Sequence, residues 1–262
     1  MSGSVILLWH VVRRVPAPLM VVTAFGWILL AGQAVVPTMP FLCLSQTRLD
    51  EVIGARLTAA LTASPPGLLM LGWLAMILAM MPPLISGQLT HVWRRSLARR
   101  RPIACLLFVL GYLTVWLTAG AALMAGILLL RACMTSDLEV VAATTLAALL
   151  WQITPLKQIS LNRCHRRPPI AVFGLRARTD ALVYGASSAM SCVGTCWGLM
   201  ALSLAVEGPA HLPLMALILV GTIFERQRAP QAPHWGAALP LATALIGLSS
   251  QRHSFALREL PR

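Results

Sequence analysis

Residues 181–206 read ALVYGASSAMSCVGTCWGLMALSLAV, a run without a single charged side chain. About 20 apolar residues in a helix are enough to cross the hydrocarbon core of a bilayer. A backbone in lipid must satisfy its own hydrogen bonds, so a segment of this length spans a membrane only as a helix. The stretch therefore predicts a transmembrane helix and an all-α fold.

The rest of the chain has the same apolar character. Of its 262 residues 58% are hydrophobic and 11% are charged, with a mean hydropathy of +0.76, whereas soluble domains carry roughly 25% charged residues. We expect residues 1–262 to form a single integral membrane domain, a polytopic transmembrane helix bundle of about seven spans. These spans are predicted at residues 17–36, 67–87, 103–128, 138–156, 180–206, 210–225 and 235–250.

The basic residues indicate how the bundle is oriented. The net charge is +13, but the cations stand in short clusters between apolar runs, which is typical of cytoplasmic membrane loops. With the N-terminus inside and the C-terminus outside, 15 of the 21 basic residues face the cytoplasm and six of the eight acidic residues face outward. The pattern predicts an N-in, C-out protein whose partner is the lipid bilayer, and it argues against nucleic acid.

Common catalytic apparatus is missing from the sequence. No phosphate-binding glycine loop, HExxH or GxSxG motif occurs, so no nucleotide cofactor and no catalytic residue are predicted. All six histidines lie at or beyond the ends of the predicted spans, which disfavours a haem held by two mid-membrane histidines. No span has a charge near its centre, although proton-coupled carriers usually need one.

Sulfur is the most distinctive side-chain chemistry of the spans. Cys192 and Cys196 are four residues apart and share a helix face, while Gly194 and Gly198 form a GxxxG pair on the opposite face, where a second helix can pack closely. Two thiols on one face favour a soft-metal site. Free cysteines are also common as small core residues, and both interpretations stay open.

Two further segments allow the same pair of interpretations. Met76 and Met80 share a face of the span at 67–87, and a thioether suits Cu(I), although methionine stripes more often serve core packing. Cys164 and His165 follow the span at 138–156 among cations, which favour the thiolate form. They are either metal ligands or ordinary parts of a basic loop.

Taken in order, these segments resemble the bacterial family described as predicted metal-binding integral membrane proteins, whose domain is uncharacterised. The likeness covers roughly residues 70–228. Its first motif matches at Met76, Ala79, Met80, Met81 and Pro83, its second at Gln152, Pro155, Leu156, Lys157, Leu161, Cys164 and Pro168, and its third at Cys192, Gly194, Cys196, Trp197, Leu199 and Met200. Glu225-Arg226 stands where the family has an acidic–basic pair.

The resemblance implies an inner-membrane protein that handles a soft metal, with copper as the expected ion. It implies Cys192, Cys196 and Met80 as ligands, with Met76, Cys164 and His165 as outer candidates. Two motif cysteines are replaced, by Ser160 and Thr195. Either the methionines and His165 complete a changed site, or the chain is a non-catalytic transmembrane subunit or scaffold that holds other membrane or periplasmic proteins.

Overall fold

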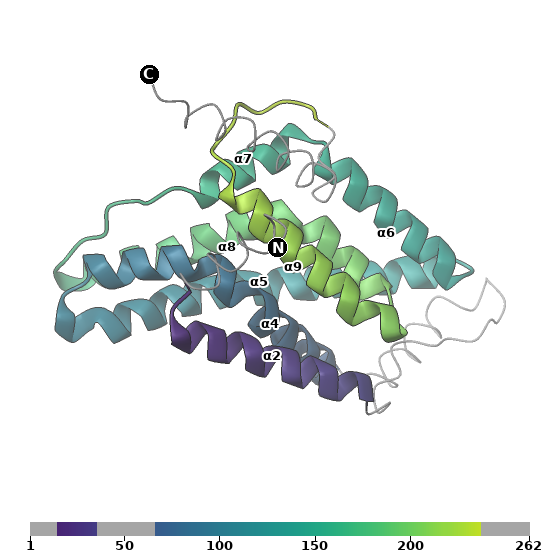
Figure 1. Cartoon of the computed structure of the whole chain (residues 1–262), viewed down its shortest axis with the longest axis horizontal. Coiled ribbons are helices and arrows are strands. Elements are labelled where there is room, and N and C mark those ends of the chain that lie inside the picture. Colours follow the sequence, from purple (N-terminus) through teal and green to yellow (C-terminus); the bar gives the residue numbers. More distant parts are fainter. Residues whose placement is uncertain (1–14, 36–65, 237–262) are drawn as a thin grey trace, which may run out of the picture.

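The computed structural model describes residues 15–35 and 66–236, and every regular element in these ranges is helical (Figure 1). The predicted all-α class is therefore confirmed for this part of the chain. The helices are α2 (Ala17–Val35), α4 (Pro66–Arg95), α5 (Arg101–Cys133), α6 (Asp137–Gln152), α7 (Pro155–Cys164), α8 (Gly174–Ala205) and α9 (His211–Gln227), with two short 3-10 turns, η1 (Ala98–Arg100) and η2 (Gly208–Ala210).

Four helical segments are long and apolar enough to cross a membrane: α4, η1–α5, α8 and η2–α9. A fifth span is possible if α6 and α7 count together, although they meet at a 69° bend. The apolar part of α2, Ala17–Gly32, is shorter. Helices overlap six of the seven predicted spans, but the count of seven is not confirmed, since four or five of them have the length and apolar character of a span. The seventh, at 235–250, lies almost wholly outside the described residues.

Prolines have different effects in two of the predicted spans. The span predicted at 67–87 contains Pro82 and Pro83, and α4 continues past both of them to Arg95. The predicted span at 138–156 instead breaks where the Thr154 side chain caps a new helix that has Pro155 in its first turn. Proline fits the first turn of a helix without loss of a hydrogen bond, and inside a membrane helix neighbouring groups can satisfy the carbonyls that it frees.

Close helix contacts occur at glycines. A Cβ added at Gly111 of α5 would overlap the backbone of α8, and one added at Gly185 of α8 would overlap the backbone of α5. The predicted packing of the GxxxG pair is also confirmed, because Gly194 lies against Ser160 of α7 and Gly198 against Ala148 of α6. The glycine face of α8 is thus covered by α6 and α7, so its sulfur face is turned toward the core.

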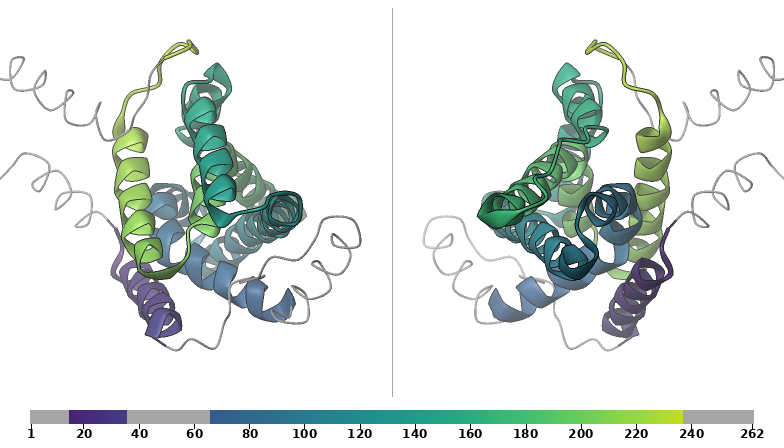
Figure 2. Two further views of the ribbon diagram at one scale, coloured as in Figure 1. Left: turned by 90° about the vertical axis from the view of Figure 1, so that its right-hand side faces the viewer. Right: turned by 90° about the vertical axis from the view of Figure 1, so that its left-hand side faces the viewer.

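The core lies between α4, α5 and α8, and α9 also contributes to it. Trp73 of α4 donates from its indole nitrogen to the backbone oxygen of Trp116 on α5 at 2.8 Å, which fixes the two helices against each other. Figure 2 shows α2 against α4, on the side away from α6. This arrangement buries Cys192 and Cys196 in the middle of α8, whereas Met190 on the other side of the helix is 67% exposed.

The two ends of the bundle carry opposite charge. Arginines gather where α4 meets α5 and where α7 leads into α8, whereas the opposite end holds Asp137, Glu139 and Glu207. There Arg131 pairs with Glu207 and lies 3.7 Å from Asp137. Partial burial raises the pKa of Glu207, and the charge of Arg131 opposes that rise.

Candidate metal centre

Cys192 and Cys196 lie on the face of α8 that is turned toward α4 and α5. Both are buried, with exposed fractions of 0% and 2%. The sulfur of Cys196 donates to the backbone oxygen of Cys192 at 3.0 Å. The predicted i, i+4 face therefore exists, and it holds two sulfurs side by side in a dry interior.

Cys192 is the centre of a cluster drawn from three helices. The hydroxyl of Tyr112 on α5 donates to its sulfur at 3.2 Å, and that sulfur lies 3.7 Å from the thioether sulfur of Met81 on α4. Tyr112 and Met81 are each only 2% exposed. Two thiols, a thioether and a phenol thus meet at one buried point.

A guanidinium from the last turn of α9 lies beside this cluster. Nη1 of Arg226 donates to the backbone oxygen of Leu84 at 3.0 Å, while its Nε and Nη2 are buried without a hydrogen-bond partner among the described residues. Within the described residues no carboxylate forms a salt bridge with Arg226. A cation held in a low-dielectric interior needs a counter-charge, and the thiol groups are positioned to supply one when they ionise.

A buried ion pair positions the end of α9. Nζ of Lys157 on α7 lies 2.5 Å from a carboxylate oxygen of Glu225 and also donates to the side-chain oxygen of Gln152. All three side chains are buried. Because Glu225 is next in sequence to Arg226, this network fixes the chain on which the guanidinium stands.

Cys164 and His165, expected as outer ligands, lie at the end of α7. Cys164 is buried, and its backbone oxygen accepts a hydrogen bond from the side-chain nitrogen of Gln88 on α4 at 3.1 Å. His165 has both ring nitrogens at backbone oxygens, Nε2 at 2.9 Å from that of Arg226 and Nδ1 at 3.1 Å from that of Leu161. His165 therefore holds α9 to α7 in this structure.

Met76 and Met80, the other expected ligands, are both buried on α4. The hydroxyl of Ser203 on α8 lies 3.7 Å from the Met76 sulfur and donates to the backbone oxygen of Met200 at 2.8 Å. Met81 of α4 therefore contacts α8 at Cys192 itself, whereas Met76 contacts α8 further along that helix, at Ser203. The residue that contacts Cys192 is the neighbour of Met80 in the sequence.

The hydroxyls of the two residues that replace motif cysteines form hydrogen bonds within their own helices. The hydroxyl of Ser160 donates to the backbone oxygen of Leu156 at 3.0 Å, and that of Thr195 donates to the backbone oxygen of Cys192 at 2.6 Å. Among the described residues no group of three or more His, Cys, Asp or Glu side chains could hold a metal ion.

Sequence reasoning did not assign Met81, Tyr112 and Arg226 to the site. Each carried a signal: Met81 belongs to a Met-Met pair followed by two prolines, and Tyr112 is one of only two tyrosines in the chain. Arg226 follows a glutamate at the end of an apolar run. An acidic–basic pair in such a place indicates buried partners elsewhere in the bundle.

Fold and site together define an all-α protein that carries a sulfur-rich cluster inside helices of membrane-spanning length. Residues 70–250 match the family model PpoB2, whose description is copper chaperone. The chain therefore belongs to this copper chaperone family, and copper is the metal that it handles. No curated protein and no solved structure gives a significant match.

Proposed function

We propose that the chain is a multi-pass membrane protein that takes up one Cu(I) ion at Cys192, Cys196 and Met81 and passes it to a partner. The observation that carries this proposal is the contact of the Cys192 and Met81 sulfurs at 3.7 Å, with the buried Cys196 sulfur 3.0 Å from the backbone oxygen of Cys192. Thiolate and thioether are the ligands that Cu(I) prefers. Copper is here the cargo of the protein.

The sulfur spacing supports a three-coordinate site. A metal–sulfur bond is about 2.3 Å long, so three sulfurs around one ion in a plane lie about 4.0 Å apart by simple trigonometry. The 3.7 Å between Cys192 and Met81 differs from this by only a few tenths of an ångström. A small shift of α4 side chains is enough to admit the ion.

The charge balance favours the same ligand set. Two thiolates and one Cu(I) carry a net charge of −1, and a thioether adds none. The guanidinium of Arg226 beside Cys192 brings the sum to zero. Because an uncompensated charge is costly in a low-dielectric interior, the loaded site is the form that this arrangement stabilises.

The remaining predicted residues take outer roles in the proposal. Met80 and Cys164 are buried near the site and could receive the ion in passing. His165 acts as a positioning residue, since its ring is bonded to the backbone of Arg226 at 2.9 Å. His165 and Arg226 would then set the charge at the site without binding copper.

A route out of the site follows the other buried sulfurs. Ser203 is eleven residues beyond Cys192, which is about 16 Å along α8 at 1.5 Å per residue, and it contacts the Met76 sulfur. Further along the chain, at the start of α9, His211 has its Nδ1 2.9 Å from the backbone oxygen of Ser203. This line ends at the acidic end of the bundle, whereas the arginines at the other end repel a cation.

The same proposal covers the topology. We infer seven spans in one domain in a bacterial inner membrane, with the N-terminus in the cytoplasm and the C-terminus outside. The helices long enough to span and the gathering of arginines at one end support it. A reporter that is active only outside the cytoplasm should be active when it is fused after Arg262. Activity of a cytoplasmic reporter at the same position would remove one span from the scheme.

The test of copper binding is metal content. The chain is purified in mild detergent from cells given copper, and the wild type is compared with Cys192→Ser plus Cys196→Ser. Cys105→Ser plus Cys133→Ser is the matched control, because these free cysteines are less buried and lie on α5. Near-stoichiometric copper in the wild type and the control, but not in the first variant, is the expected result. Copper-free protein in all three would overturn the proposal.

The second candidate function is a scaffold for a larger membrane complex. The hydroxyls of Ser160 and Thr195, both bonded to backbone oxygens where motif cysteines stood, favour it. It predicts a partner that co-purifies equally well with the wild type and with Cys192→Ser plus Cys196→Ser. Loss of the partner together with copper would instead support transfer of the metal to that partner.

A further inference from the structure

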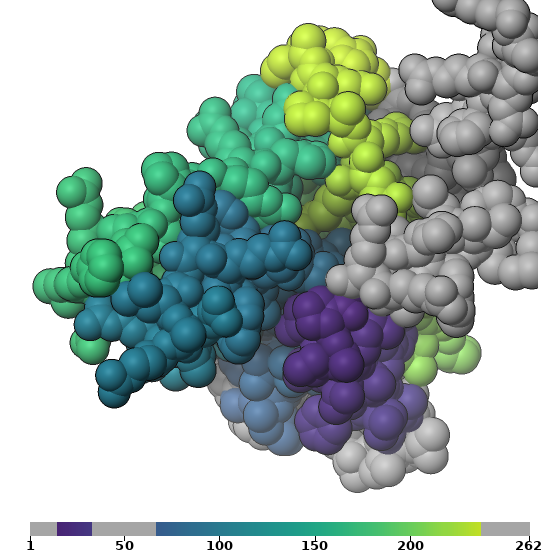
Figure 3. All heavy atoms as spheres, turned by 60° about the vertical axis from the view of Figure 1, so that its left-hand side comes forward, coloured from purple at the N-terminus to yellow at the C-terminus, as the bar shows by residue number. Residues whose placement is uncertain are grey.

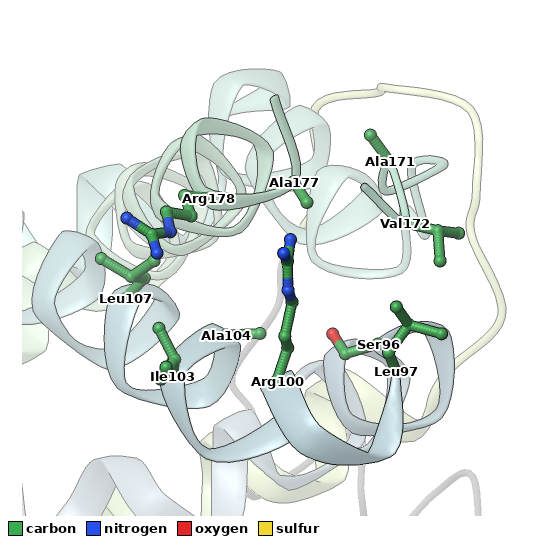
Figure 4. A pocket seen from close by; sticks show the side chains of 10 residues that line it. All are labelled: Ser96, Leu97, Arg100, Ile103, Ala104, Leu107, Ala171, Val172, Ala177 and Arg178. Carbon is green, nitrogen blue, oxygen red and sulfur yellow. The ribbon is translucent and has the colours of Figure 1, made fainter. Parts of the chain in front are cut away.

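A hollow opens at the arginine-rich end of the bundle, away from the cysteines (Figure 4). Its walls come from two junctions, residues 96–107 between α4 and α5, and residues 171–178 between α7 and α8. About 440 Å³ of space lies between these walls, and this figure includes open solvent. Figure 3 shows the α4–α5 part in blue next to the start of α8 in green.

Two cations reach this hollow from opposite walls. Figure 4 shows the side chain of Arg100 extending into its centre and that of Arg178 standing over Leu107. In the described ranges neither forms a salt bridge with a carboxylate. The nearest acidic residue in sequence, Asp180, accepts a hydrogen bond from the backbone nitrogen of Ala171 at 2.9 Å. Asp180 thus holds the wall at Ala171, and the two arginines outnumber this carboxylate, so the hollow is positive overall.

The rest of the lining is apolar and continues onto the outer surface of the helices. Leu97, Ile103, Leu107 and Val172 line the hollow. Beyond it, Leu106 on α5 and Leu175 on α8 are 58% and 73% exposed. A small water-soluble anion gains nothing from contact with this apolar surface. A molecule with a charged headgroup and hydrocarbon chains can contact both the arginines of the hollow and the leucines beside it.

We propose that this hollow binds the phosphate headgroup of an anionic phospholipid, with its acyl chains lying along the exposed leucines of α5 and α8. The inference rests on the membrane-spanning part of the proposed function and is independent of copper. Basic pockets between transmembrane helices on the cytoplasmic side commonly take anionic headgroups. Its position at the α4–α5 and α7–α8 junctions lets one lipid tie the two junctions together.

The test is lipid binding by native mass spectrometry of the full chain in mild detergent. Phosphatidylglycerol, phosphatidylcholine and glycerol 3-phosphate are added separately, and Arg100→Gln plus Arg178→Gln is compared with the wild type. The matched control is Arg99→Gln plus Arg176→Gln, which removes the same charge from exposed positions of the same junctions that do not line the hollow.

We expect one tightly held phosphatidylglycerol on the wild type and on the control. Two arginines at an anionic headgroup correspond to a roughly 10- to 30-fold loss of affinity in the hollow variant. Equal losses in both variants would mean that only overall charge matters, and equal binding of phosphatidylcholine would exclude headgroup recognition. Equal binding of glycerol 3-phosphate would make the site one for a free anion, and each of these results overturns the proposal.

Copper content separates this inference from the copper site. The hollow variant should retain copper like the wild type, because its substitutions are exposed and lie away from Cys192. A variant that loses lipid and keeps copper supports the lipid site alone. Loss of both lipid and copper, with an altered elution profile, would mean that the substitutions disturb the fold. In that case the lipid extracted from the correctly folded control variant decides whether a selective anionic lipid is bound at all.

Discussion

Replacing Met81 by leucine should weaken copper binding much more than the same change at Met80. Met81 touches the Cys192 sulfur at 3.7 Å, whereas Met80 is turned about 100° around the axis of α4. Both are buried almost completely, with exposed fractions of 2% and 1%. Exchanging methionine for leucine nearly conserves volume and usually costs less than about 1.5 kcal/mol, so both variants should fold.

The size of the effect follows from the geometry that remains. Without the thioether, two thiolates alone would have to bind Cu(I) in line, about 4.6 Å apart for bonds of about 2.3 Å. Cys192 and Cys196 stand one helical turn apart on α8, with the Cys196 sulfur at the backbone oxygen of Cys192, so a linear site would require both side chains to move in a packed core. Changes in the outer shell of metal sites already cost about 10–100-fold. Loss of a direct ligand should therefore cost about 100-fold, or about 2.7 kcal/mol.

The assay is competition with a colorimetric Cu(I) chelator, with X-ray absorption at the copper edge to count sulfur neighbours. Met81→Leu should release copper at about 100-fold lower chelator concentration and show two sulfurs in place of three. Met80→Leu should stay within about threefold of the wild type. Equal losses, or a greater loss at Met80, would refute the assignment of the thioether ligand.

Three further changes probe the surroundings of the site. Arg226→Gln removes the charge that balances the loaded site, and this charge is worth about 4 kcal/mol for a near pair at an effective dielectric of 20. Copper retention should fall at least 100-fold, while the melting temperature of the copper-free protein stays the same or rises. Unchanged retention would contradict the charge argument. Lys157→Met leaves Glu225 buried without its partner, which costs about 3–5 kcal/mol, so thermal unfolding in detergent should occur earlier and should recover in the double variant with Glu225→Gln. Gly111→Ala should destabilise the folded protein by about 1–3 kcal/mol through overlap with the backbone of α8. Gly126→Ala, where the added methyl group meets open space on the same helix, should not. Equal melting temperatures of the two variants would show that the α5–α8 contact is not tight.

Local spacing was enough to predict what happens within a single helix. The shared face of Cys192 and Cys196, and the packing of Gly194 and Gly198 on the other side, follow from 100° per residue. Which methionine of α4 faces Cys192 depends on how α4 is rotated, and that rotation is set by distant contacts. Trp73 bonds to the backbone of Trp116, and Gly26 of α2 packs directly on the α4 backbone before the two prolines.

Buried charge was the feature that sequence spacing could not predict. No span was expected to hold a charge near its centre, and Lys157 and Glu225 do lie near the ends of α7 and α9. They are nevertheless buried, because the 69° bend between α6 and α7 folds Lys157 back onto α9. The partners are 68 residues apart, so no local pattern could have paired them.

A copper chaperone must hold its ion firmly and still release it, and the proposed site meets both needs by charge. With Arg226 beside two thiolates, the loaded site is neutral and loses little by being buried. The sulfurs beyond it, Met76 among them, are neutral thioethers that bind Cu(I) more weakly than thiolates do and take it up without a proton leaving. On this proposal the ion leaves by exchange from thiolate to thioether along α8, and the acidic residues around Glu207 attract it while the arginines at the opposite end repel it. Direction of transfer then follows from the placement of charge in the bundle and from a receiving partner that binds Cu(I) more tightly than the thioethers do, and the two vacated thiolates take up protons.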